Sequence, residues 1–200
     1  PLVSYTEALN RLKEGNANFQ KNFRKDRELL EEVKANANGQ SPFATVLSCI
    51  DSRMPAEMIF DQGIGDLFSV RIAGNFVNQD ILGSMEFASV VSTTRLIVVM
   101  GHTSCGAIKG ACDNVELGNL TAMLRNLHPA IQAVKEPTDP AQRNSKNKEF
   151  TNDVSTQNVY LTIERILNES EALKEMVDND ELLIVGAMYD ISNGVVTFFE

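Results

Sequence analysis

The stretch FATVLSCIDSRM, residues 43–54, joins a mostly apolar run directly to a cysteine, an aspartate and an arginine spaced two apart. The run at 43–48 is short and uncharged, which is typical of a strand covered on both faces of a parallel sheet. Alternation along an extended chain would place Cys49, Asp51 and Arg53 on the same side. Charged residues straight after a buried strand indicate a functional site at the strand end, with a surface ion pair as the alternative.

Other parts of the chain repeat this strand pattern. Apolar runs at 66–74, 95–102 and 181–191 predict further strands covered on both faces. Helical patterns alternate with them, at 55–60, 80–92, 118–134 and 155–167, and the polar stretch 135–153 is expected to be one long loop. Asn193-Gly194 predicts a hairpin that turns the last strand back antiparallel at a sheet edge. The predicted fold class is α/β, with a mostly parallel central sheet flanked by helices.

The N-terminal region has its own helical signals. Ser4 is a plausible N-cap, with Glu7 three residues later as in a capping box, and a charged helical segment follows at 28–42. We expect residues 1–200 to form one domain in which residues 1–40 are an N-terminal helical arm. The apolar face of the first helix would pack on the chain's own core or lie on a partner subunit.

Composition narrows the range of partners. A chain of 200 residues with 43% hydrophobic content can bury a sizeable core, and its net charge of -9 argues against binding nucleic acid or an anionic membrane. No window approaches the ~18 apolar residues that a membrane span requires. We expect a soluble, cytoplasmic protein that binds a small molecule or another copy of itself. Since the chain begins at Pro1, a periplasmic location is the alternative if a leader was removed.

The three cysteines are too few for a disulfide framework, and a second cluster suggests another use for two of them. In VVMGHTSCG, His102 ends the predicted strand and Cys105 begins a helix. Because the carboxyl ends of parallel strands face one side, Cys49, His102 and Cys105 can converge there. Two thiolates and one imidazole suit Zn²⁺, and a fourth, open position is typical of a catalytic zinc. Cys112 and His128 share no spacing with these ligands and are interpreted as structural.

The two motifs together identify a family. SCIDSRM with GHTSCG resembles the C-x-D-x-R and H-x-x-C motifs of the bacterial-type β-class carbonic anhydrases. The resemblance extends to PAEMIFDQGIGDLFSVRIAGN, GSMEFA and LIVVMGHTSCGAIKG, and covers most of the chain. It implies that Cys49, His102 and Cys105 bind one zinc per chain, that Asp51 and Arg53 form a catalytic dyad, and that the protein is a homodimer or a dimer of dimers.

The expected reaction is reversible hydration of CO2 to bicarbonate and a proton by zinc-bound hydroxide. Two thiolates reduce the effective charge of zinc, so an acceptor near the water is needed; Asp51, held by Arg53, can take that role. Hydrolysis of carbonyl sulfide or carbon disulfide at the same site is the alternative reaction. The alternative from another functional class is a structural or regulatory protein that binds zinc and has no turnover. The presence of both Asp51 and Arg53 disfavours this alternative.

A dry pocket for a neutral linear substrate would involve apolar residues near the motifs. Candidates are Ile72, Phe76, Val77 and Phe87, each of which could equally be an ordinary core residue. Many relatives have Tyr in place of Phe87, so that hydroxyl is missing here. Some relatives have a Gln that orients the substrate in the loop after the first motif. In an ungapped match, Gln62 falls one residue before that position.

Some relatives close the site by moving the equivalent of Asp51 onto zinc, a state that bicarbonate favours from a pocket containing Trp. This chain has no Trp, although Arg71 could still meet an anion. Bidentate pairing with Arg53 should hold the Asp51 carboxylate away from the metal. We therefore expect an open site at rest and no cooperative inhibition by bicarbonate.

Overall fold

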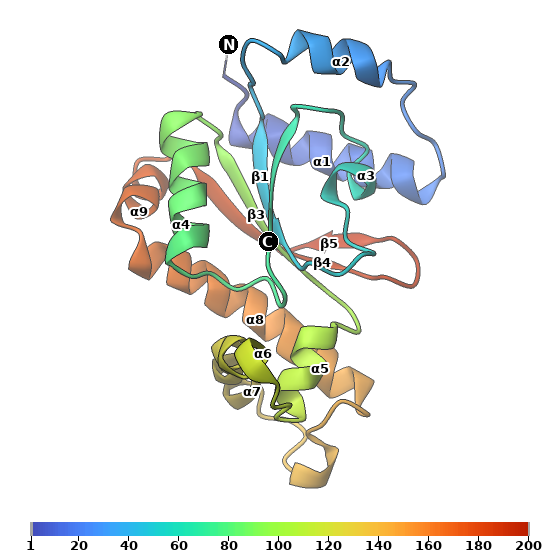
Figure 1. The fold of residues 1–200 in the computed structure, drawn as a ribbon, viewed down its shortest axis with the longest axis vertical. Coiled ribbons are helices and arrows are strands. Elements are labelled where there is room, and N and C mark those ends of the chain that lie inside the picture. The colour runs from blue at the N-terminus through green and yellow to red at the C-terminus, as the bar shows by residue number, and fades with distance from the viewer. Residues whose placement is uncertain (1, 200) are drawn as a thin grey trace.

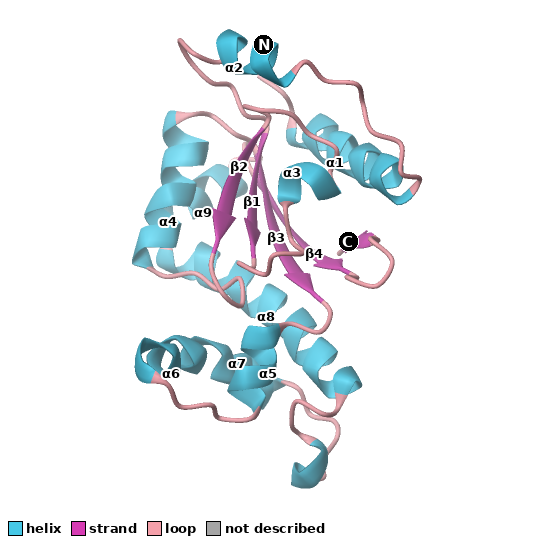
Figure 2. Ribbon diagram, turned by 45° about the vertical axis from the view of Figure 1, so that its right-hand side comes forward, coloured by secondary structure: helices cyan, strands magenta, loops and turns pink. Residues whose placement is uncertain are grey.

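The computed structural model describes residues 2–199, in which five strands form one sheet with helices on both faces (Figures 1 and 2). The strand order is β2-β1-β3-β4-β5, with the first four strands parallel and β5 antiparallel to β4. The strands are β1 (Ala44–Ser48), β2 (Leu67–Arg71), β3 (Leu96–His102), β4 (Leu183–Tyr189) and β5 (Val196–Phe198). The predicted α/β class and the antiparallel edge strand are confirmed.

Burial along the strands follows their place in the sheet. Every residue of β1 and β3 is buried, as the continuous apolar runs predicted. The expectation that β2 is also covered on both faces is wrong, because its residues alternate between covered and exposed positions. β2 lies at the edge of the sheet, where one face receives less cover than in the centre.

The helices form layers around this sheet. In Figure 1, α1 and α3 lie on one side, α4, α8 and α9 on the other, and α5, α6 and α7 lie beyond the carboxyl ends of the strands. The α-helices are α1 (Tyr5–Gln20), α2 (Leu29–Ala35), α3 (Ala56–Ile59), α4 (Gln79–Glu86), α5 (Gly106–Cys112), α6 (Gly118–Leu124), α7 (His128–Ala133), α8 (Lys148–Glu169) and α9 (Glu171–Asp178).

Helix α1 packs on the chain's own core. Ser4 is its N-cap and accepts a hydrogen bond from the Glu7 amide, although the Glu7 carboxylate pairs with Arg11 and does not complete the capping box. Ala8 and Leu12 are fully buried, which confirms core packing of the apolar face. Helix α2, in contrast, has no buried residue.

Three differences from the predicted helices have local causes. The loop predicted at 135–153 ends at Asn147, whose side chain caps α8 by accepting from the Phe150 amide. The pattern at 118–134 forms two helices separated by a 3₁₀ turn, because Pro129 restarts the chain at the first turn of α7. Helix α9, which was not predicted, begins at a second side-chain cap, Ser170.

The predicted hairpin joins β4 to β5. Gly194 has a φ of 80°, a left-handed conformation that glycine adopts without steric cost. Asn16 of α1 donates to the Gly194 carbonyl at 2.9 Å and so ties the hairpin to the first helix. Between residues 2 and 199, no helix has the length and apolar character needed to cross a membrane.

Candidate metal centre

The candidate site lies where the strand order changes direction. β1 pairs with β2 on one side and with β3 on the other, so the chain leaves β1 toward one edge and later returns on the opposite side. In open parallel sheets, a crevice forms at the carboxyl ends of such neighbouring strands. Cys49 directly follows β1 and His102 is the last residue of β3, so both lie at this crevice.

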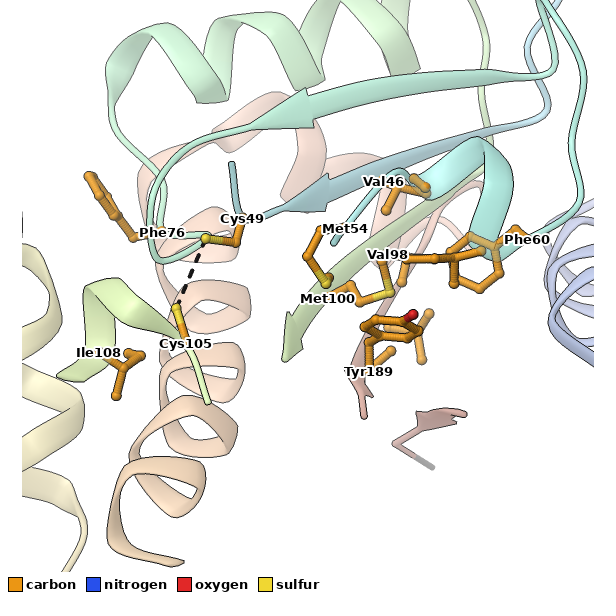
Figure 3. Packing of buried hydrophobic residues seen from close by; sticks show 14 of the residues in the cluster. Val46, Cys49, Met54, Phe60, Phe76, Val98, Met100, Cys105, Ile108 and Tyr189 are labelled. Carbon is orange, nitrogen blue, oxygen red and sulfur yellow. Dashed lines mark hydrogen bonds between the residues drawn. The ribbon is translucent and has the colours of Figure 1, made fainter. Parts of the chain in front are cut away.

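The three predicted ligands converge. One ligand atom from each of Cys49, His102 and Cys105 lies within 4.8 Å of the others, and all three residues are buried. The two sulfurs are 4.0 Å apart, as the dashed line in Figure 3 marks. Segments far apart in the sequence thus bring two soft sulfur ligands and one imidazole to a single point.

The imidazole has a nitrogen free for a metal. Nδ1 of His102 lies 3.0 Å from the Thr103 carbonyl oxygen, which can only accept, so Nδ1 carries the hydrogen. Nε2 then has a lone pair, and it is buried with no hydrogen-bond partner among the described residues. An unpaired buried nitrogen next to two thiols is the arrangement that Zn²⁺ would satisfy, so the donor set fits this metal.

The two thiols influence each other's ionisation. The hydrogen bond with Cys105 lowers the pKa of Cys49 to about 4, and the contact with His102 acts in the same direction. The same hydrogen bond, followed by burial, raises the pKa of Cys105. Without a cation, the pair favours one thiolate that shares the proton of its neighbour, because two adjacent buried negative charges repel. A bound divalent cation would allow both to ionise.

Asp51 and Arg53 form a bidentate ion pair beside the ligands. Arg53 Nε donates to Asp51 Oδ1 at 2.8 Å and Nη2 donates to Oδ2 at 2.6 Å. The hydrogen bonds from Arg53 lower the pKa of Asp51 well below its usual range. Asp51 Oδ2 lies 4.0 Å from His102 Nε2, which places an ionised acceptor next to the ligand set.

Arg71 holds the backbone around this pair. Its Nε donates to the Cys49 carbonyl at 2.9 Å and its Nη2 donates to the Asp51 carbonyl at 2.6 Å. These bonds fix the chain on both sides of Ile50. The structure therefore uses Arg71 to position the motif, and two of its donors are directed to carbonyls instead of an anion.

A cavity of about 300 Å³ opens beside Cys49 and Asp51. Its walls are mainly small and aliphatic side chains. The remaining lining residues are Ile50, Ala73, Gly106, Ala107, Gly110, Leu120, Met123 and Leu124. This cavity is suited in size and polarity to a small neutral molecule.

None of the five predicted pocket residues is among those that line this cavity. Phe76 lies beside Cys49 in Figure 3 and is buried, Val77 is fully buried, and Ile72 is half-buried against the core. Gln62 donates to a backbone carbonyl at 2.5 Å in the turn after α3. Phe87 is 51% exposed and lines a separate groove beside β2.

Sequence reasoning missed a row of polar residues on α8 that contact the site's loops. Asn152, Ser155, Asn158 and Thr162 each form a hydrogen bond with backbone near a ligand. Their spacing of three or four residues could have been noticed, since a helix that covers a sheet normally presents apolar side chains at these positions.

Known proteins share both the sequence and the fold. A family model described as carbonic anhydrase matches residues 44–196. Carbonic anhydrase 2 of Mycobacterium tuberculosis is 33% identical over 195 residues, which cover 97% of this chain and 92% of that protein. The carbonic anhydrase of Mycolicibacterium smegmatis is 31% identical over 169 residues, covering 84% and 79%.

Solved structures agree with this assignment. The β-carbonic anhydrase CcaA superimposes with a TM-score of 0.75 and 25% identity, covering 96% of this chain and 95% of that one. The β-carbonic anhydrase CafA of Aspergillus fumigatus has a TM-score of 0.73 at 24% identity, covering 98% and 90%. Because the family model spans most of the chain and the relatives match nearly its whole length, the chain belongs to the β-carbonic anhydrase family.

Proposed function

We propose that this carbonic anhydrase hydrates CO2 to bicarbonate and a proton at a zinc ion held by Cys49, His102 and Cys105. The observation that supports this most directly is the buried, unpaired Nε2 of His102 in a group with two thiols. When bound, zinc supplies a Lewis acid that activates water for attack on the carbon of CO2.

The chain's own residues would orient that attack. Asp51 is an acceptor close to the ligand set, and its bidentate pairing with Arg53 keeps the carboxylate ionised and fixes its direction. A hydrogen bond from the attacking water to Asp51 would hold a lone pair toward the substrate. The Thr103 carbonyl fixes the His102 tautomer, so that the imidazole can act as a neutral ligand.

The cavity beside Cys49 is the proposed site for CO2. Its wall is mainly aliphatic, and Cys49 and Asp51 are the lining residues that adjoin the proposed metal site. A neutral linear molecule loses little hydration when it enters such a space, whereas bicarbonate is strongly hydrated. This difference favours substrate entry and product release.

The test is stopped-flow CO2 hydration with protein whose zinc content has been measured, with hydrolysis of carbonyl sulfide followed in parallel. We expect turnover of CO2 that scales with zinc occupancy. Turnover of carbonyl sulfide alone would support the alternative hydrolase. Zinc-loaded protein without activity on either substrate would contradict an enzymatic role.

We also propose that the resting site is open, with Asp51 on Arg53 and not on the metal. Both Asp51 oxygens already accept hydrogen bonds from the guanidinium, and two thiolates would satisfy most of the metal's charge. Bicarbonate should then inhibit without cooperativity. A crystal structure near pH 8 with Asp51 bound to zinc, or a sigmoidal inhibition curve, would contradict this.

For assembly, we propose a homodimer or a dimer of dimers. Large apolar side chains remain exposed in two regions of the chain, which a partner subunit would cover. These are Phe23, Leu29, Leu30 and Val33 around α2, and Phe87, Val90 and Val91 after α4. Sedimentation at micromolar concentration should give a species larger than the 22.1 kDa chain, and a monomer alone would contradict the proposal.

A further inference from the structure

Helix α8 presents buried polar side chains to the loops that follow β2 and β3 (Figure 2 shows the helix crossing below the carboxyl ends of the strands). Ser155, Asn158 and Thr162 are at most 4% exposed, and Asn152 is half-buried one turn earlier. Burying amides and hydroxyls is costly unless they form hydrogen bonds. Their bonds are made with two particular turns, each of which adjoins a cysteine ligand.

Both turns contain backbone in the left-handed region. Gly74 has a φ of +82° and Asn75, which follows it, has a φ of +40°. Ser104, directly before Cys105, has a φ of +56°. Such conformations are unfavourable for residues other than glycine and persist where surrounding contacts hold them. The Asn75 carboxamide is buried without a hydrogen-bond partner among the described residues, so it does not support its own turn.

Helix α8 supplies the contacts that hold the first turn. Asn158 Nδ2 donates to the Gly74 carbonyl at 2.8 Å, and Thr162 Oγ1 donates to the Asn75 carbonyl at 3.4 Å. On its other side, the same turn directs the Gly74 amide to Cys49 Sγ, with a nitrogen to sulfur distance of 3.4 Å. The Gly74 carbonyl that Asn158 holds therefore belongs to the peptide group next to the one whose N–H donates to the Cys49 sulfur.

The second turn is held in the same way. Asn152 Oδ1 accepts a hydrogen bond from the Ser104 amide at 2.9 Å, which orients the residue before Cys105. Ser155, on the same face of the helix, donates to the His102 carbonyl at 3.0 Å. Helix α8 therefore forms hydrogen bonds with backbone groups next to all three candidate ligands and fixes their positions relative to one another.

We infer that Asn158 and Asn152 are positioning residues that hold the two thiols in place for the metal before the metal binds. The inference rests on the proposed zinc site. Asn158 has a further effect through the Gly74 amide, because an N–H donor to a thiolate withdraws negative charge from the sulfur. Support of this kind behind the ligands typically changes metal affinity by about 10- to 100-fold.

The variant test compares Asn158→Leu, which removes the donor at similar volume, with Thr151→Val. Thr151 is equally buried on α8, but its hydroxyl donates only to the Lys148 carbonyl within the helix. In chelator competition, we expect Asn158→Leu to bind zinc about 10- to 100-fold more weakly and Thr151→Val to match the natural chain. The sulfur-to-metal charge-transfer band of the Co²⁺-substituted Asn158→Leu protein should also shift.

Equal zinc affinity and an unshifted band in Asn158→Leu would overturn the inference. Asn152→Ala provides the parallel test at Cys105, with weaker zinc binding expected and unchanged binding counting against the role of α8. Since these variants could fail to fold, hydrogen exchange of the unmutated protein gives an independent measurement. The Gly74 and Ser104 amides should be protected in both the metal-free and zinc-loaded states.

Rapid exchange of either amide in the metal-free protein, with protection only after zinc is added, would overturn the inference, because the metal would then order the turns. None of these measurements depends on CO2 turnover. If the unmutated chain bound no zinc, the proposed function would fail together with the inference. If it bound zinc and the Asn158 and Asn152 variants bound it equally well, the inference alone would fail.

Discussion

Helix α5 has a buried cysteine at each end, and the two thiols have different surroundings. Cys105, the N-cap residue, is 1% exposed and lies 4.0 Å from the Cys49 sulfur in a group with His102. Cys112, the last residue of the helix, is 7% exposed and lines a cavity of about 300 Å³ that His128 also lines. In the described part of the chain, no third ligand joins Cys112 and His128.

Burial alone therefore does not make a cysteine a candidate ligand. Burial, followed by the nearby Asp113 carboxylate, raises the pKa of Cys112 to about 11, which keeps it a neutral thiol. At the other end of the helix, a hydrogen bond with Cys105 lowers the pKa of Cys49 to about 4. Convergent donors, and not the depth of the site, distinguish the candidate metal centre.

The largest expected effect is that of Cys105→Ser. A serine hydroxyl is a poor zinc ligand, so the variant should lose stoichiometric zinc and CO2 hydration together. Elemental analysis and stopped-flow assays of the same sample would measure both. One zinc per chain in this variant would show that the ligand assignment is incorrect.

Asp51→Ala should separate metal binding from catalysis. Asp51 pairs with Arg53 and is not among the three candidate ligands, so zinc content should stay at one per chain. Loss of the acceptor should reduce CO2 turnover by about 100-fold, within the range for a proton-accepting group. Turnover close to that of the natural chain would remove Asp51 from the mechanism.

Cys112→Ala should lower the stability of the fold and leave metal binding and catalysis unchanged. The free energy of unfolding should fall by about 1 kcal/mol, because a buried side chain loses its contacts. Zinc content and turnover should not change. Urea denaturation and metal analysis would check this, and a loss of zinc would mean that the two ends of α5 are not independent.

A last difference between the two cysteines concerns the dependence of stability on pH. The pKa of Cys112 is raised in the folded state to about 11, so the folded protein holds this proton more tightly than the unfolded chain. Its stabilising effect is fully present below about pH 9, the ordinary thiol value, and is lost as pH rises from there toward 11. Between pH 8.5 and 10.5, the Cys112→Ala variant should therefore lose less stability than the natural chain in urea titrations. Equal losses of stability in the two proteins over this pH range would contradict the raised pKa of Cys112.

Much of the site could be predicted because its residues directly follow buried strands. A five- to seven-residue apolar run determines a central strand, and in a parallel sheet the next residues lie at the carboxyl edge. Cys49, Asp51 and His102 were predictable for this reason, with Cys105 added by its short spacing from His102. The hairpin at Asn193-Gly194 was predictable because Gly194 adopts the left-handed φ of 80° at this turn without steric cost.

Other features depended on contacts between distant segments. The sequence of β2 does not reveal that it lies at the sheet edge, because strand order is decided by how the helices connect and pack. Likewise, residues of α5 and α6 line the cavity beside Cys49, whereas the predicted Phe87 follows α4 and lies exposed in a separate groove beside β2. Periodicity indicates which face of an element is apolar, but it does not identify the element that covers that face.

The sequence by itself determined the central strands, the types of candidate ligand and the Asp51 and Arg53 pair, since these follow from short-range pattern and side-chain chemistry. Only the tertiary structure decided which contacts support the candidate ligands. Arg71 binds the carbonyls on either side of Ile50, and Asn158 reaches a turn 84 residues earlier in the chain. Such bonds form between backbone groups and side chains from remote segments, and because every residue other than proline offers the same backbone donor and acceptor, no residue pattern specifies which ones will meet.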